Sequence, residues 1–143
     1  MPTSAAFLEM TAKASEWLHD TMRYLAIEDE HQGLHALRAG LHTLRDRLPV
    51  SEVVDLAAQL PTIIRGIYFE GWQPRNDPTT IRTRAALLAR VRAHQGNDHR
   101  LDPEAVMRAV MRVIAWHVSA GEINDIMSTM PQAIANLLED GMA

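Results

Sequence analysis

Cysteine is absent from this sequence of 143 residues. Its absence excludes disulfide bonds, thiolate metal ligands and cysteine nucleophiles, and it fits a reducing compartment, so we expect a cytoplasmic protein. Glycine-rich phosphate loops are also missing, because the sequence contains neither Gly-x-Gly-x-x-Gly nor a Walker motif. No Gly-x-Ser-x-Gly motif is present, and no serine lies beside a plausible base. These absences favour a protein that is not an enzyme.

Long apolar runs are missing too, since no stretch approaches the roughly 18 uninterrupted apolar residues of a membrane span. The N-terminus has no basic segment, and Glu9 and Lys13 interrupt its apolar residues, so we expect no signal peptide and no membrane partner. Lys13 is the one lysine among 14 basic residues, a bias more typical of a GC-rich genome than of a mechanism. The formal charge of -4 disfavours nucleic acid as a partner.

The apolar residues that are present recur with helical spacing throughout the chain. One apolar stripe runs from Phe7 to Leu25, with Met10 and Trp17 beside it, and a second runs from Leu34 to Leu48 until Pro49 stops it. Two short helices follow, separated by Pro61 and closed by Gly71. The second half of the chain has the same order. Its expected helices span residues 79–95 after Asp77-Pro78, residues 103–118 after the cap Asp102, and two short segments separated by Pro131.

The two halves are related in sequence, because a shift of 70 residues places positions 36–71 on 106–141 without a gap. Seven positions are identical in the two copies: Arg38/Arg108, Ala39/Ala109, Glu52/Glu122, Asp55/Asp125, Pro61/Pro131, Ile64/Ile134 and Gly71/Gly141. The apolar stripe is kept as well. We therefore predict an all-α fold: a compact bundle of about eight helices built from two tandem four-helix repeats. The repeats are residues 1–72 and 79–143, joined by a linker at 73–78 within one compact domain, and they should superpose.

Two segments carry a resemblance to a known family. The run Leu44-Arg-Asp-Arg-Leu-Pro-Val-Ser-Glu, followed by Asp55-Leu-Ala-Ala-Gln-Leu-Pro61, resembles the bacterial family named domain of unknown function 2267. The second copy, His117-Val-Ser-Ala-Gly-Glu-Ile and then Met130-Pro131, is similar to the same motif. The resemblance covers roughly residues 7–72 and 79–140. It implies an α-helical bundle, and it implies no activity, cofactor or catalytic residue.

Histidine and methionine are the residues of this chain that suggest a metal or cofactor site. His31, His35 and His42 would share one face of a continuous helix, which is raw material for a zinc or iron site. However, His31 corresponds to Leu101, which precedes the cap Asp102, so we expect His31 in a loop, out of register with His35. We predict that His35 and His42 do not jointly bind a metal and that the protein has no cofactor. Four methionines are interpreted as core residues: Met107, Met111, Met127 and Met130.

Charged residues were considered for catalysis and for binding. Glu52/Asp55 and Glu122/Asp125 stand three residues apart in the first turn of a short helix, and Ser119 and Glu122 have the spacing of a capping box. We interpret these acidic residues as helix caps, because two catalytic sites would need matching partners. Residues 79–100 are basic, and their expected complement is the acidic turn at 28–30. The basic residues in question are Arg82, Arg84, Arg90, Arg92 and Arg100.

The second copy of the second helix is apolar over an unusually wide arc. Positions that are small or polar in the first copy, such as Gly40, become Val106, Val110 and Val113 in the second. A helix so apolar must be covered on two faces, which predicts that residues 103–118 lie at the centre and cross closely over Gly40. Val110→Asp should then abolish folding. Trp116 lies beyond both apolar faces and is either a partner contact or a half-buried packing residue.

The sequence therefore predicts a non-catalytic bacterial helical module for protein-protein association, in a stress or accessory role. Its partner would be another protein or a second copy of this chain. The alternative is a small ligand or cofactor in the groove between the repeats. Polar residues that converge between the halves would favour the ligand, and an exposed apolar strip would favour association.

Overall fold

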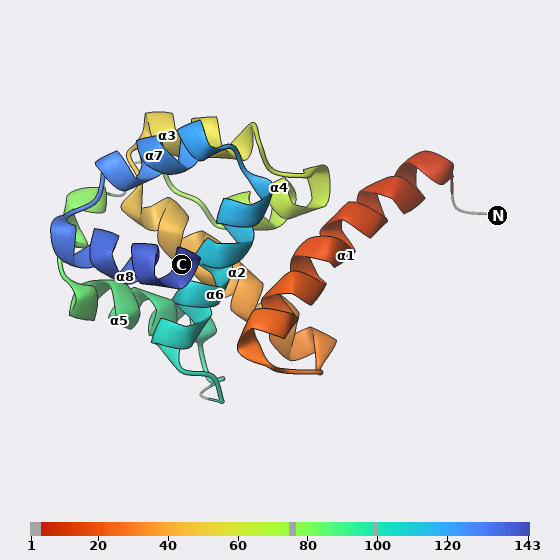
Figure 1. Ribbon diagram of the computed structural model, residues 1–143, viewed down its shortest axis with the longest axis horizontal. Coiled ribbons are helices and arrows are strands. Elements are labelled where there is room, and N and C mark those ends of the chain that lie inside the picture. The colour runs from red at the N-terminus through yellow and green to blue at the C-terminus, as the bar shows by residue number, and fades with distance from the viewer. Residues whose placement is uncertain (1–3, 75–76, 99) are drawn as a thin grey trace.

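The computed structural model describes residues 4–74, 77–98 and 100–143, which contain helices and no strand, so the all-α prediction is confirmed. The helices are α1 (Ala5–Leu25), α2 (Glu30–Arg47), α3 (Val50–Ala57), α4 (Thr62–Phe69), the short 3-10 helix η1 (Pro78–Thr80), α5 (Arg84–Gln95), α6 (Pro103–His117), α7 (Ala120–Ser128) and α8 (Gln132–Met142) (Figure 1). None of these helices has the length and apolarity needed to cross a membrane. Residues 75 and 76 of the predicted linker, and residues 1–3, lie outside the described range.

Two helix starts differ from the sequence predictions. α5 begins at Arg84 and not near residue 79, because the Thr83 side chain caps it by accepting the Ala86 N–H (3.1 Å), whereas Asp77-Pro78 opens only the 3-10 turn. α2 begins earlier than predicted, at Glu30, because the Asp29 side chain accepts the N–H groups of His31 (2.9 Å) and Gln32 (3.3 Å). The prediction that His31 lies in a loop is therefore wrong.

The centre of the molecule is the crossing of α2 and α6. Val106, Val110 and Val113 on α6 are fully buried, which confirms the central position predicted for this helix. A Cβ built on Gly40 of α2 would lie only 2.4 Å from a Cγ atom of Val110, so the two helices approach as closely as glycine permits. The methionines predicted to fill the core are buried or partly buried against it.

The remaining helices pack around α2 and α6 in corresponding ways. α1 contacts α2, α4 and α6, and α5 contacts α6, α8 and α2, which are the equivalent helices under the 70-residue shift. α3 contacts its counterpart α7, and Figure 1 shows the two side by side. The ends of α2 and α6, at Arg47 and His117, also correspond, since 47 + 70 = 117. That the two halves superpose stays a prediction. Corresponding contacts between equivalent helices are a condition that such a superposition has to meet.

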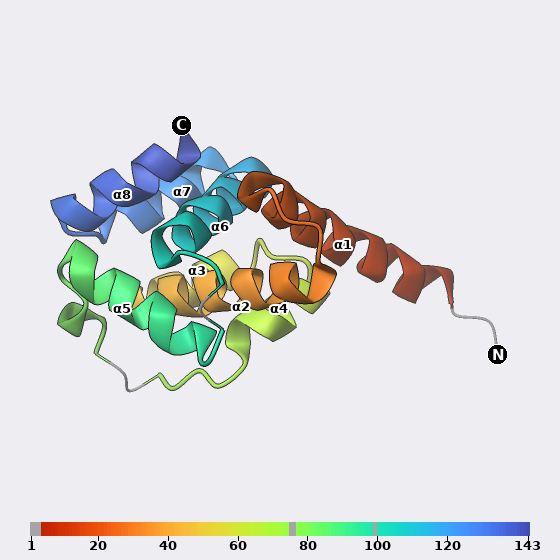
Figure 2. The same cartoon turned by 90° about the horizontal axis from the view of Figure 1, so that it is seen from below.

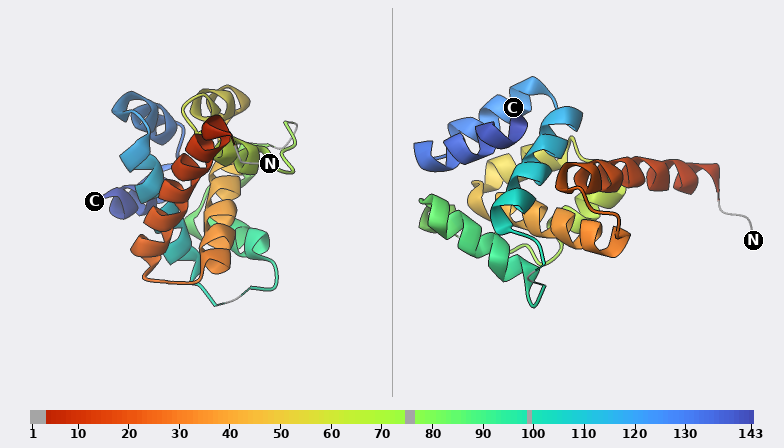
Figure 3. Two further views of the ribbon diagram at one scale, coloured as in Figure 1. Left: turned by 90° about the vertical axis from the view of Figure 1, so that its right-hand side faces the viewer. Right: turned by 60° about the horizontal axis from the view of Figure 1, so that its bottom comes forward.

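One segment leaves the body of the molecule. The N-terminal half of α1 extends away from the other helices (Figures 1 and 2, and Figure 3, right). We call residues 5–13 the α1 arm. Phe7 and Leu8 on this arm are 63% and 56% exposed, whereas Trp17, ten residues after Phe7 on the same helix, is buried. The first half of the predicted α1 stripe is therefore not part of the core.

Candidate functional site

The α3–α7 contact brings together the acidic residues that the sequence repeats. Glu52 and Glu122 stand in the first turns of α3 and α7, and both side chains are buried. The nearest carboxylate oxygens of Glu52, Glu122 and Asp125 all lie within 4.8 Å of one another. Asp125 is exposed and stands at the outer edge of the group. We call these three residues the carboxylate cluster.

The glutamates of the cluster do not cap their helices as the sequence analysis predicted. Ser119 does accept the Glu122 N–H (3.2 Å), which is one half of a capping box. The other half is missing, because the Ser119 N–H donates to Gln59 Oε1 (2.8 Å) and not to Glu122. In the first half of the chain the N-cap is Pro49, which has no N–H to offer Glu52. Neither carboxylate therefore caps its own helix, and the two lie next to each other between α3 and α7.

The cluster is electrostatically uncompensated. Glu52 Oε1 and Glu122 Oε1 are fully covered and have no hydrogen-bond partner. Within the described ranges, no arginine, lysine or histidine forms an ion pair with Glu52, Asp55, Glu122 or Asp125. Burial raises the pKa of Glu122 well above the usual range of a glutamate, and the adjacent Glu52 carboxyl raises it further. The two repeated motifs thus form one shared site, where the sequence analysis considered only two separate ones.

The histidines that the sequence suggests as metal ligands have different partners. His35 Nε2 lies 2.8 Å from the carbonyl oxygen of Gln95, and His42 Nε2 lies 2.7 Å from that of Ile67. His31 is exposed in the first turn of α2. The Nε2 atoms of His35 and His42 are thus each held by a different backbone carbonyl.

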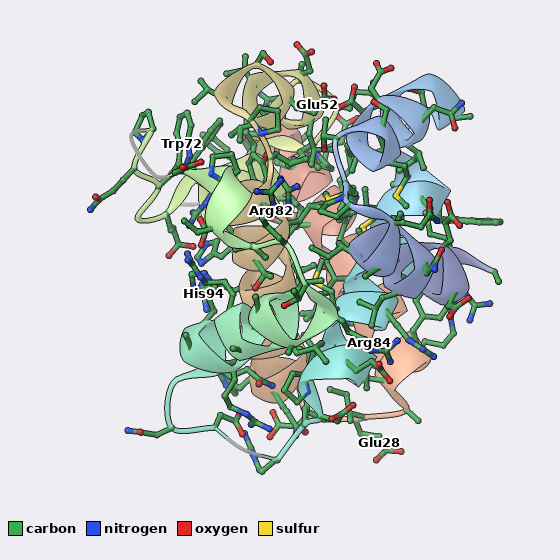
Figure 4. All side chains as sticks on the ribbon, turned by 90° about the vertical axis from the view of Figure 1, so that its left-hand side faces the viewer. Glu28, Glu52, Trp72, Arg82, Arg84 and His94 are labelled. Atoms are coloured by element: carbon green, nitrogen blue, oxygen red, sulfur yellow. The ribbon has the colours of Figure 1, made fainter. Side chains whose placement is uncertain are left out.

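A buried polar network joins α2 to α5. Asp46 Oδ1 accepts a hydrogen bond from Arg45 (2.9 Å). Asp46 Oδ2 accepts one from Arg90 (3.1 Å) and lies 2.7 Å from His94 Nε2. Burial alone would raise the pKa of Asp46, but the hydrogen bonds from His94 and Arg45 outweigh it and lower the pKa to about 2. The His42 ring packs edge-on against His94, and burial lowers the pKa of His42. His94 is labelled in Figure 4.

A second histidine–aspartate pair joins α6 to α1. His117 Nε2 lies 2.8 Å from Asp20 Oδ2, and the His117 ring stacks on Trp17 with 4.9 Å between centroids. Sequence reasoning missed both histidine–aspartate pairs, because their partners are 48 and 97 residues apart in the chain. The repeat alone would lead one to expect that the two halves make polar contacts with each other, but not which residues make them.

The arginines of residues 79–100 do not mainly complement the acidic turn at 28–30. Arg84 binds Glu104 and Arg90 binds Asp46, so that prediction is wrong for these two, and Arg100 binds Asp98 first. Asp29 of the turn contributes only to the electrostatic environment of Arg100. In Figure 4, Arg82 and Arg84 lie at separate places on the face shown, so they do not form one basic stripe.

The surface of the protein has one exposed tryptophan and two concave regions that bear on function. Trp116 is 76% exposed, so the half-buried packing interpretation of this residue is wrong and the partner contact stays a prediction. A groove of about 340 Å³ lies between the α1 arm and the start of α4, and a cleft of about 230 Å³ lies between the halves. The cleft is lined by Lys13, Glu16, Trp17, Gln59, Pro61 and His117.

Comparison with known protein families gives a match over most of the chain. Residues 14–137 match a family model described as "Uncharacterized conserved protein (DUF2267)". No curated protein matches the sequence. The matched range contains both glutamates of the carboxylate cluster, and it begins after the α1 arm.

Proposed function

The chain belongs to the DUF2267 family, whose description names no activity, and we propose that it is a non-catalytic accessory protein that associates with other protein through its α1 arm. The observation that carries this proposal is the exposure of Phe7 (63%) and Leu8 (56%) on a helix that projects from the body. Large apolar side chains that project together from a globular body are typical of interaction sites.

The arm continues the stripe by which α1 packs on its own protein. Phe7, Met10, Ala14 and Trp17 lie on one face of α1, given 100° per residue. Ala14 and Trp17 pack against the core, whereas Phe7 is exposed and Met10 lines the groove beside the start of α4. An isolated helical segment of this length is marginal in water, because most helical stability comes from tertiary packing. A partner that covers Phe7 and Met10 would supply that packing.

A second copy of this chain fits the arm best. Thr11 stands between Phe7 and Leu8 around the helix, given 100° per residue. If two arms pack antiparallel about Thr11, Phe7 and Leu8 of each copy are covered by the other copy. The same arrangement is isologous, and it closes as a dimer without forming fibres. The groove beside the arm, which Met10 lines, is available to the second arm as well.

The expected interaction is weak. Two short arms bury an area at or below the low end of stable interfaces, about 1,200 Å² in total, so we expect a dissociation constant in the micromolar range. Sedimentation velocity over a range of protein concentrations should show a monomer–dimer equilibrium. The double substitution Phe7→Ser, Leu8→Ser should shift it towards the monomer by about tenfold or more, because both side chains lose their partner surface.

A matched control is Val50→Ser on α3, which alters a side chain of similar exposure (47%) away from the arm and should leave the equilibrium unchanged. Trp116→Ser tests the other exposed aromatic surface. A protein that is monomeric at every concentration, or a dimer lost only with Trp116→Ser, would contradict the proposal for the arm.

A small ligand in the cleft between the halves is the second candidate. Polar side chains from both halves do converge there, including Gln59 and His117. However, the cleft of about 230 Å³ is smaller than the roughly 300 Å³ at which ligand pockets usually begin. Native mass spectrometry of freshly purified protein distinguishes the two functions, because it reports a bound small molecule and the oligomeric state in one measurement.

A further inference from the structure

We propose that the carboxylate cluster between α3 and α7 binds a hard divalent cation, and that Ca²⁺ fits it better than Mg²⁺. The ligands would be Glu52 from the first half of the chain, and Glu122 and Asp125 from the second. Figure 4 shows Glu52 at the end of the molecule where α3 and α7 lie. The site would therefore join the two halves through one ion.

The first argument is the missing counter-charge. Other inward-facing carboxylates of the chain are paired, since Asp46 is bonded to Arg45, Arg90 and His94, and Asp20 to His117. Glu52 and Glu122 are each more than nine-tenths buried, and an oxygen atom of each is fully covered without any partner. Buried ionised groups are normally paired or coordinate a metal. Apart from the hydrogen bond between the two glutamates themselves, the described residues provide no partner, so a bound cation would supply the missing charge.

The second argument is the ligand chemistry. All three groups offer carboxylate oxygens, and no nitrogen or sulfur ligand belongs to the cluster. Oxygen-only sites favour Ca²⁺, Mg²⁺ and Mn²⁺, whereas zinc and copper favour imidazole and thiolate. Waters on the exposed side, next to Asp125, would complete the coordination shell and provide the path of entry.

The third argument is the separation of the oxygens, which lie within 4.8 Å of one another. Two oxygens on one ion can be at most twice the metal–oxygen distance apart, about 4.6–5.2 Å for Ca²⁺ and about 4.0–4.2 Å for Mg²⁺. This upper limit allows all three oxygens to reach one Ca²⁺, which takes six to eight oxygen ligands in flexible geometry. Mg²⁺ demands near-ideal octahedral geometry and keeps several of its waters, so a cluster of three carboxylates suits it less.

The test uses the full-length protein after treatment with a chelator and its removal. Calcium chloride is titrated by isothermal calorimetry near neutral pH, and thermal unfolding is followed with and without the ion at constant ionic strength. We expect one site per chain with a dissociation constant of about 10 µM to 1 mM, and a melting temperature that rises and saturates with Ca²⁺. Magnesium chloride should bind more weakly, by about tenfold or more.

Two variants and one control identify the site. Glu122→Gln removes one ligand charge with little change of shape, and Asp125→Asn alters the exposed ligand without disturbing the core. Each should weaken Ca²⁺ binding by about tenfold or more and reduce the thermal shift. Glu139→Gln changes an exposed carboxylate on α8 outside the cluster and should bind as the unaltered protein does.

Several results would overturn the proposal. Absence of heat and of thermal shift with Ca²⁺, Mg²⁺ and Mn²⁺ would show that no cation binds. Equal weakening by Glu139→Gln would show that the ion acts only by general screening. If Glu122→Gln stabilises the metal-free protein and the unaltered protein ignores every cation, a shared proton occupies the space between the glutamates and the metal site does not exist.

Discussion

At the residue scale, Gly40 determines how closely the two central helices approach. Val110 fills the space that a side chain at position 40 would occupy, and its three side-chain carbons all lie within 2.9 Å of a Cβ built on Gly40. Valine is stiff at χ1 and is buried on all sides here, so it has no alternative rotamer into which it could withdraw. The glycine is therefore required by packing and not by backbone conformation.

Gly40→Ala should destabilise the protein by about 1–3 kcal/mol, because the added methyl group overlaps Val110. Urea unfolding monitored by circular dichroism measures the change. Gly66→Ala is the matched control: Gly66 also lies in a helix, and a Cβ there meets nothing within 4 Å. It should stabilise the protein by up to about 1 kcal/mol through helix propensity. Equal effects at the two sites would contradict the close crossing.

Asp46→Asn should reveal a pH-dependent contribution to stability. The folded-state pKa of Asp46 is about 2, below its ordinary value of 3.8, so its contribution is complete above the ordinary value and is lost as the pH falls towards 2. The shift corresponds to a contribution on the order of 2 kcal/mol. The stability difference between the native protein and Asp46→Asn should therefore shrink by about 1 kcal/mol from pH 6 to pH 3. A difference that does not change with pH would contradict the role assigned to Asp46.

At the scale of the helices, equal residues in the two halves serve unequal purposes. Gly71 follows α4 with a φ of 70°, which favours glycine, whereas Gly141 lies inside α8, where a Cβ would be 2.8 Å from the backbone of Arg108. By contrast, Arg38 and Arg108 keep one role: Arg38 pairs with Glu70 and Arg108 with Asp140, which are 70 residues apart. Sequence identity between the copies therefore does not by itself give the physical reason for a residue.

The start of α7 depends on a residue from the first half of the chain. Gln59 donates to Ser119 Oγ (3.0 Å) and accepts the Ser119 N–H (2.8 Å). Ser119→Ala should cost about 1 kcal/mol, because the helix loses its N-cap. A double-mutant cycle with Gln59→Ala should show a coupling energy of about 0.5–1 kcal/mol in chemical unfolding. Additive effects would mean that the two exposed side chains do not cooperate.

At the scale of the whole molecule, the two halves share one hydrophobic core. The buried cluster includes α2 residues such as Leu37 and Leu41 together with α6 residues such as Met107 and Val110. Each half therefore leaves its central helix uncovered without the other. The halves are repeats in sequence, and we expect them to be a single unit in folding.

Fragments 1–72 and 79–143 should each lack cooperative structure when they are expressed alone, whereas the full chain should unfold in one transition. Far-ultraviolet circular dichroism against temperature distinguishes these states, and mixing the two fragments should recover part of the helical signal. If either fragment unfolds cooperatively by itself, the two halves are independent domains.

Much of the architecture follows from the sequence. Helical periodicity and the prolines at 61 and 131 place most helix boundaries, because these signals act within a few residues of the chain. The wide apolar arc of residues 103–118 also identifies the central helix, since such a helix must be covered on two faces. The early start of α2 at Asp29 and the late start of α5 at Thr83 were missed, because several residues compete as caps and packing selects one.

The sequence by itself determines which residues are helical, which face of each helix is apolar, and that the two halves share a pattern. Only the tertiary structure decides that Glu52 meets Glu122, that Asp46 meets His94, and that the apolar stripe of α1 continues beyond the body. The reason is physical: periodicity reports the environment of a residue along its own helix. The partner of a side chain across 48 or 70 residues depends on how the helices cross, and this is set by contacts such as that of Gly40 with Val110.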